Sequence, residues 1–387
     1  MNRSRPRTEP VRWEARWRGG AAAFLALVLA GTACARGIGE DGAPADLYLA
    51  PEATSPTEPA PAGGDPASDE AGRSAWSLAI DPATLMAAVD DAGGGTGDAT
   101  APVVPAEGPS WFRCPLPAHN LQGVGGGLIS PMAYLVSPGP PGTEAGLPSL
   151  SYTFVRLGTK TAHVTAVTET LWRRVEIGYA FTTLALGNFP DDVQDTTGVD
   201  IGLDHVMVHY FNLRGLLIEE TPTCPAVTGG VTFMYNPNVQ NIDRRLNGGV
   251  RNLGLERANG TDFTLTASKT FPTLFFGRPV MLSGGIRFSQ ASQIGTLGFG
   301  DAYRMTGEGS VFAFVTDCLV LGYEYRQKKG ALDRLGDLVK DEDDWHAVIL
   351  AFCISPRCCI AVGWGHFGNL ANADENGVWG FQFKYDF

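Results

Sequence analysis

The chain ends in Trp379-Gly380-Phe381-Gln382-Phe383-Lys384-Tyr385-Asp386-Phe387, a stretch in which every second residue is aromatic. Successive side chains of a β-strand point to opposite faces, so this stretch predicts a strand with one aromatic face and one polar face. Such a strand is typical of the wall of a transmembrane β-barrel, where apolar side chains face lipid and polar side chains face the lumen. A final strand that covers a soluble core is the alternative.

The N-terminus favours the membrane interpretation. Residues 1–18 contain six arginines, residues 19–30 form an apolar run, and Ala33-Cys34-Ala35 follows. This order is typical of a secretory signal peptide, which we place at residues 1–35. A rival interpretation makes Cys34 a lipidated cysteine, although Gly31 stands where lipoprotein signals normally carry a larger aliphatic residue.

Composition narrows the class of protein further. No stretch reaches the roughly 18 consecutive apolar residues that a transmembrane helix needs. The net charge of −12 argues against a nucleic-acid partner, for which a basic surface is expected. Glycine makes up 49 of the 387 residues and the mean hydropathy is −0.02. These values suit a barrel, because lipid-facing and lumen-facing positions average out along each strand.

The remainder of the chain divides into three parts. Residues 36–110 are rich in Pro, Ala, Gly, Asp, Glu and Ser. They predict a disordered linker, since such a segment cannot bury enough apolar surface to offset its chain entropy. Residues 111–146 would form a plug or a periplasmic segment, and residues 147–387 would form the barrel.

Short alternating runs separated by turn residues predict an all-β fold, a transmembrane antiparallel β-barrel of about 12 strands. An even number of strands is the rule for single-chain bacterial barrels. The strands are expected near 149–157, 161–171, 174–184, 204–218, 226–236, 262–270, 279–290, 304–315, 318–328, 344–354, 357–366 and 379–387.

The lengths of the connections support this arrangement. Counted back from a periplasmic C-terminus, the short links near 172, 316 and 355 fall on the periplasmic side. The long links all fall outside, at 185–203, 237–261, 291–303, 329–343 and 367–378. Short periplasmic turns and long external loops are the expected asymmetry of outer-membrane barrels. The tight turn 158–160 is the exception, because it comes out external.

The same alternation assigns charged side chains to the lumen. Both signs occur, which predicts ion-pair networks and not a surface of a single sign. The expected lumen-facing charges are Arg174, Glu176, Asp262, Arg287, Glu324, Arg326, Lys384 and Asp386.

Six cysteines remain after the signal peptide, an even number that permits disulfides in an exported chain. Five of them fall at periplasmic strand ends, where Cys353 and Cys358 flank a short turn. We predict at least one disulfide at this rim, while small thiols that fill space there are the alternative. The candidates are Cys318, Cys353, Cys358 and Cys359.

One external loop is acidic, and its carboxylates could bind a hard cation such as Ca²⁺. The spacing is not that of an EF-hand, so a solvated acidic loop is the stronger interpretation. The weak metal candidates are Asp191, Asp192, Asp195, Asp200 and Asp204. His205 and His209 share one strand face but lie about 13 Å apart, too far to bind one metal.

Several stretches resemble a bacterial family known only as domain of unknown function 3034. They are Pro115-Leu116-Pro117-Ala118-His119-Asn120-Leu121-Gln122-Gly123, residues 191–202, residues 262–272 and Phe367-Gly368-Asn369-Leu370-Ala371-Asn372. The likeness covers roughly residues 111–387 and implies an outer-membrane barrel. It implies no activity, substrate or cofactor. The cysteines at 353, 358 and 359 depart from the family pattern.

We therefore expect an exported protein of the bacterial outer membrane, with membrane lipid and the barrel assembly machinery as partners. The assembly signal would be Phe381, Phe383, Tyr385 and Phe387. A porin-like channel for small solutes is the first functional hypothesis. The second is a closed structural or adhesion barrel whose N-terminal arm binds a periplasmic or cell-wall partner. An outer-membrane hydrolase is the weakest, because the chain has no G-x-S-x-G nucleophile turn, and we expect neither an enzyme nor a cofactor.

Overall fold

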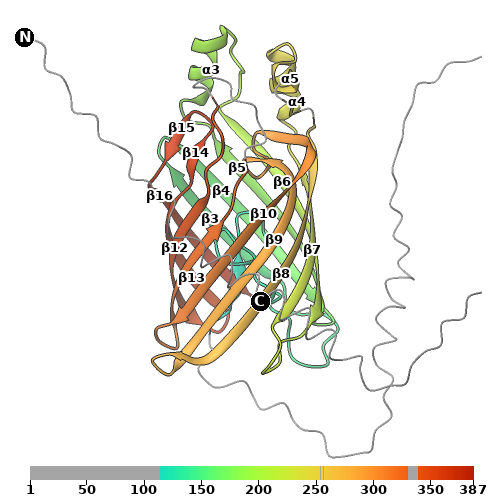
Figure 1. Cartoon of the computed structure of the whole chain (residues 1–387), viewed down its shortest axis with the longest axis vertical. Helices are drawn as coiled ribbons and strands as arrows, with labels where there is room; N and C mark the ends of the chain where they lie inside the picture. The colour runs from blue at the N-terminus through green and yellow to red at the C-terminus, as the bar shows by residue number, and fades with distance from the viewer. Residues whose placement is uncertain (1–113, 253, 256, 330–338) are drawn as a thin grey trace, which may run out of the picture. The chain divides into compact units, whose positions relative to one another are not determined.

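The structure, a computed structural model, describes residues 114–252, 254–255, 257–329 and 339–387. The predicted signal peptide with Cys34, the linker at 36–110 and residues 111–113 lie outside the described residues. Within the described part, twelve strands form one closed antiparallel barrel (Figure 1). Neighbours along the chain are neighbours in the wall, and the last strand pairs with the first, so the barrel has no free edge.

The twelve predicted strands are confirmed, with ends that differ by a few residues. The barrel strands are β3 Ser149–Leu157, β4 Lys160–Leu171, β5 Val175–Ala185, β6 His205–Ile218, β7 Ala226–Tyr235, β8 Asn259–Phe275, β9 Arg278–Ser292, β10 Gly298–Phe314, β11 Leu319–Arg326, β12 Trp345–Ser355, β13 Cys358–His366 and β16 Val378–Asp386.

The predicted long loop at 291–303 is wrong. Strands β9 and β10 continue toward each other, and only residues 293–297 connect them. The pairing of these strands shifts between Phe299 and Arg304. A bulge of this kind breaks the period-two pattern, which is why the alternation in the sequence ended the strands too early.

The connections are sorted between the two ends of the barrel. Short links at 172–174, 276–277, 315–318 and 356–357, together with 219–225, define one end, which we call the turn rim. Long links at 186–204, 236–258, 327–344 and 367–377 define the opposite end, the loop rim, with 158–159 and 293–297. Helices α3 Phe189–Thr197, α4 Val239–Arg245 and α5 Gly249–Asn252 lie in two of these long loops (Figure 1).

The outer face of the barrel is apolar over most of its strands. Large hydrophobic side chains stay exposed there, among them Tyr152, Ile177, Phe211, Phe233, Phe263, Leu321, Leu350, Val362, Trp364, Trp379, Phe381 and Phe383. On β16 the aromatic side chains face outward, while Gln382, Lys384 and Asp386 are buried inside. A closed barrel with an apolar exterior suits lipid on every side. None of the helices among the described residues could cross a bilayer.

The aromatic stripe on β16 should tolerate size changes but not charge. Phe381 lies at mid-strand between Phe154 and Val362, with 41% of its surface exposed. We expect Phe381→Arg to lower the free energy of unfolding in lipid vesicles by about 2–4 kcal/mol, the usual cost of a lipid-facing cation near the membrane centre. Phe381→Leu is the control and should cost much less. Urea unfolding of both variants measures the difference, and equal losses would place Phe381 outside the lipid.

Candidate functional site

A separate stretch of chain occupies the barrel interior near the turn rim. This lumenal segment, residues 114–136, contains the short strands β1 Ala118–His119 and β2 Gly125–Gly126 and is almost wholly buried. It begins near the turn rim, where the Cys114 thiol contacts the Asp317 carbonyl. It ends at the same rim, where Thr170 of β4 donates a hydrogen bond to the Val136 carbonyl. The segment therefore enters and leaves by one end of the barrel.

Glu324 of β11 binds the backbone of the lumenal segment. Its carboxylate accepts hydrogen bonds from the amides of Leu128, Ile129 and Ser130, at 2.8, 3.0 and 3.0 Å, and from the Ser130 hydroxyl at 2.6 Å. Gly127 lies so close that a side chain there would overlap this carboxylate. Four charge-assisted bonds on one buried carboxylate fix the tip of the segment against the wall.

A buried ion pair holds the returning arm of the segment. Arg214 of β6 and Glu176 of β5 lie 2.6 Å apart and are almost inaccessible. Both side chains also form hydrogen bonds to the backbone of the lumenal segment. Glu176 accepts a bond from the Val136 amide at 2.8 Å, and Arg214 donates to the Met132 carbonyl at 2.7 Å. The wall charges therefore pair with the segment's backbone as well as with each other.

His119 is held by neutral polar groups. Its two ring nitrogens lie 2.8 Å from the Ser151 hydroxyl and 2.9 Å from the Thr168 hydroxyl. Gln382 donates to the His119 carbonyl at 2.6 Å. Each hydroxyl can donate or accept, so these bonds satisfy either neutral tautomer of the ring.

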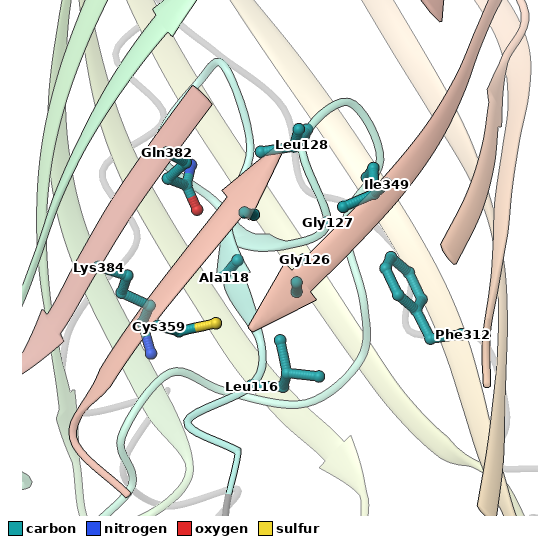
Figure 2. Close-up of a pocket in the computed structure, with 12 residues that line it drawn as sticks. Leu116, Ala118, Gly126, Gly127, Leu128, Phe312, Ile349, Cys359, Gln382 and Lys384 are labelled. Atoms are coloured by element: carbon teal, nitrogen blue, oxygen red, sulfur yellow. The ribbon is translucent and has the colours of Figure 1, made fainter. Parts of the chain in front are cut away.

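Lys384 binds the start of the lumenal segment. Its ammonium donates to the Pro115 carbonyl at 2.8 Å and pairs with Asp386 at 2.9 Å. A small cavity lies between the segment and this part of the wall, and Figure 2 shows Lys384 and Cys359 on two wall strands beside Leu116 and Ala118.

A second ion network belongs mainly to the wall. Arg287 of β9 lies 2.9 Å from Asp262 and 3.1 Å from Glu308, and all three are buried. Arg326 lies 3.9 Å from Glu308 and donates to the Ile129 carbonyl at 3.3 Å. The wall network thus reaches the lumenal segment at Arg326 and at Asp262, which accepts a hydrogen bond from Gln122 at 3.3 Å.

Seven of the eight predicted lumen-facing charges lie inside the barrel, and Arg174 does not. It belongs to the 172–174 turn, pairs with Glu219 and leaves 51% of its side chain exposed. The prediction missed Arg214 and Glu308, both buried. Both sit at inward positions of their strands, so the period-two pattern would have indicated them.

Residues of the loop rim pack together inside the opposite half of the barrel, in a cluster that we call the loop-rim seal, residues 293–294, 345 and 367–370. The rings of Trp345 and Phe367 stack at 4.3 Å with 6° between their planes. Tyr210 of β6 donates to the Ile294 carbonyl at 2.9 Å, and Gln293 donates to the Asn369 carbonyl at 3.0 Å. The seal is apolar at its centre and hydrogen-bonded at its edges.

The acidic loop does not assemble a cation site. Helix α3 carries Asp191, Asp192 and Asp195, while Asp200 and Asp204 follow it. Asp192 accepts a bond from Asn372, Asp200 accepts one from the Gly202 amide, and Asp204 pairs with His205. The hydrogen bond from His205 lowers the pKa of the exposed Asp204. Among the described residues, no group of three metal-ligating side chains converges.

His205 and His209 lie in different environments. His205 pairs with Asp204 at the loop rim, 2.6 Å away. His209 lies on the outer face, where Tyr179 approaches its ring nitrogen at 2.9 Å and Tyr235 stacks on it. The outward placement of His209 leaves it remote from the polar lumen.

The four disulfide candidates are thiols in the structure. The register also changes the expected pair, because Cys353 faces Cys359 and not Cys358. A register shift between Cys353 and Ser355 moves the pairing by one residue. The bridge itself stays a prediction. Cys224, at the same rim, is disulfide-bonded.

Together, the closed wall, the apolar exterior and the charged side chains buried inside define a transmembrane β-barrel of the outer-membrane type. The chain belongs to the family described as protein of unknown function (DUF3034), whose model matches residues 117–383. No curated protein matches it.

Among solved structures, the chain is similar to the NanC porin, with 8% identity, 62% of this chain and 98% of that chain covered, and a TM-score of 0.39. It is similar to the KdgM porin, with 10% identity, coverages of 62% and 99%, and a TM-score of 0.38. It is also similar to the outer membrane protein Omp33 of Acinetobacter baumannii, with 10% identity, coverages of 63% and 99%, and a TM-score of 0.33.

Proposed function

We propose that the protein is a gated outer-membrane channel for small solutes. The lumenal segment closes the turn-rim half of the pore, and the loop-rim seal closes the other half. The observation that carries this proposal is the set of buried wall charges that bind the segment's backbone, Glu176, Arg214, Glu324, Arg326 and Lys384. Once the segment leaves, the same side chains would line a hydrophilic pore.

The way in which the lumen is filled supports a movable closure. Barrels of about eight strands are filled by their own side chains, whereas larger barrels enclose a space. Here a distinct segment fills that space. Because it enters and leaves at the turn rim, it can withdraw without crossing the wall.

The sides of the membrane follow from the loops. Short turns lie on the periplasmic side of such barrels, so we place the turn rim in the periplasm and the loop rim outside. Recognition of the terminal aromatic stripe by the barrel assembly machinery fits this orientation, and a transport role needs no catalytic residue.

The test compares single-channel recordings of the full-length protein in planar bilayers with those of Glu324→Gln. Loss of the charge weakens hydrogen bonds to a charged acceptor, worth about 1.5–3 kcal/mol. We expect a rise in open probability of roughly 10-fold to 100-fold, since every 1.4 kcal/mol is tenfold. Glu308→Gln is the matched control. It removes a buried wall carboxylate whose partners are Arg287 and Arg326, and since it affects the lumenal segment only indirectly, through Arg326, it should raise the open probability much less than Glu324→Gln.

A closed structural barrel is the second candidate, and the stacked Trp345 and Phe367 of the loop-rim seal favour it. If the wild type and both variants fold, shift on heat-modifiable gels and remain silent at every voltage, the channel is withdrawn and the closed barrel stands. If Glu308→Gln opens the pore as much as Glu324→Gln, the lumenal segment is not the gate.

A further inference from the structure

Three buried thiols meet at the turn rim, and two of them belong to neighbouring wall strands. Cys353 of β12 and Cys359 of β13 face each other in register, with their sulfur atoms 3.3 Å apart. Both side chains point into the barrel and are 5% and 3% exposed. Cys358, the next residue on β13, is more exposed and pairs with Ser355 instead.

The third thiol belongs to the lumenal segment. Cys114 is 5% exposed and belongs to the same buried cluster as Cys353 and Cys359, with its thiol next to that of Cys353. It also contacts the Asp317 carbonyl in the turn between β10 and β11, at 3.7 Å. Cys353 therefore touches one cysteine on the wall and one on the lumenal segment, and only the second contact joins the segment to the wall.

A small cavity lies beside this cluster, and Cys359 is the member of the cluster that lines it. Figure 2 shows the Cys359 sulfur between the wall and the lumenal segment, next to Leu116 and Ala118. Thiols this deeply buried favour a small oxidant such as hydrogen peroxide over a protein oxidant.

We propose that Cys114, Cys353 and Cys359 form a redox site that locks the lumenal segment. Oxidation to a Cys114–Cys353 disulfide ties the segment to the wall and holds the pore closed. Oxidation to Cys353–Cys359 joins two wall strands and leaves the segment free to move. The locking role rests on the proposed channel function, but the two disulfides can be tested without it.

The chemistry balances with hydrogen peroxide as the oxidant. The Cys353 thiolate attacks one peroxide oxygen and becomes a sulfenic acid, while the other oxygen leaves as water after taking a proton. The Cys114 thiolate then displaces hydroxide from the Cys353 sulfur, which forms the disulfide and a second water. In total two thiols and one peroxide give one disulfide and two waters.

The two disulfides can interconvert without an oxidant. The Cys359 thiolate attacks the Cys353 sulfur, the bond between Cys353 and Cys114 breaks, and Cys114 leaves as a thiolate. One proton passes from Cys359 to Cys114. The shared sulfur of Cys353 makes this exchange local, because all three thiols lie in one cluster.

The sequence allows the two disulfides to be distinguished after trypsin cleavage. Cleavage at lysine and arginine puts Cys114 in peptide 114–156, Cys353 in 341–357 and Cys359 in 358–384. We would oxidise the full-length protein with hydrogen peroxide in lipid vesicles and map linked peptides by mass spectrometry without reduction. In the wild type we expect 341–357 linked to each of the other two.

Three variants sharpen the mapping. Cys359→Ser should give the link between 114–156 and 341–357 alone, and Cys114→Ser should give the link between 341–357 and 358–384 alone. Cys358→Ser is the control for loss of a cysteine on β13, and it should reproduce the wild-type pattern. Heat-modifiable migration confirms that each variant is a folded barrel. If no variant links peptide 114–156 to 341–357, the proposal is wrong.

Conductance measurements then test the locking role of the disulfide separately from the channel function. In Cys359→Ser, peroxide should lower the open probability at least tenfold and a thiol reductant should restore it, whereas Cys114→Ser should not respond. If the Cys114–Cys353 disulfide forms and the conductance does not change, the disulfide is only a structural link, and the proposed locking role is wrong. If the link forms and no variant ever conducts, the channel proposal fails while the disulfide stands.

Discussion

A variant that lacks residues 114–136 and carries Phe367→Ala is expected to conduct ions steadily, with none of the gating of the wild type. The deletion removes the lumenal segment, and the substitution breaks the Trp345–Phe367 stack at the centre of the loop-rim seal. Two seals in series conduct only when both are open, so either change alone should give a smaller effect than the two together. Planar-bilayer recording of the single and combined variants measures this.

The physical reason for the large effect is the chemistry of the uncovered wall. Glu176, Arg214 and Glu324 would exchange their bonds to the segment for bonds to water, so a hydrated path replaces a packed interior. Phe276→Ala is the control, since Phe276 is 92% exposed at the turn rim and belongs to neither seal. A combined variant that folds as a barrel and stays silent would remove the channel and leave the closed structural barrel.

Replacement of Arg287 by alanine is expected to destabilise the barrel by about 3–5 kcal/mol. Arg287 is 1% exposed and pairs with Asp262 and Glu308. Its loss leaves the buried Asp262 without its cation and leaves Glu308 with Arg326 alone, 3.9 Å away. Urea unfolding in lipid vesicles, followed by tryptophan fluorescence, gives the free energy.

Arg257→Ala provides the matched comparison for an exposed pair. Arg257 and Asp301 lie 2.9 Å apart, with 53% and 63% of their side chains exposed. Solvent screens such a pair, and we expect a loss below about 1 kcal/mol. Similar losses for Arg257→Ala and Arg287→Ala would mean that water reaches the Arg287 network.

The sequence predicted the strands of the barrel wall well because side chains along a β-strand alternate between its two faces with a period of two residues. The alternation in 174–184 and 318–328 predicted β5 and β11 to within a few residues. The same alternation put Glu324 and Lys384 inside, where they lie. Arg174 was misplaced because the alternation runs on into a turn, where period two no longer describes the backbone.

Irregular backbone explains the strand ends and strand pairings that the sequence did not predict. The bulge in β10 hid the strand that replaces most of the predicted loop at 291–303. The shift after Cys353 changed its partner from Cys358 to Cys359. Bulges depend on the pairing of two strands, and a pattern read along one strand carries no information about its partner.

The sequence by itself determined that this protein is a closed transmembrane barrel of about twelve strands, which faces lipid with its apolar side chains and keeps most of the predicted charges inside. Side-chain alternation is a local property, and a continuous apolar exterior permits no other closure in lipid. Only the tertiary structure decided what fills the lumen. Residues 114–136 have no period, and their course depends on bonds to Glu324, Glu176 and Lys384, far away in the chain. The same long-range packing brought Cys114 to Cys353 and so created the thiol cluster.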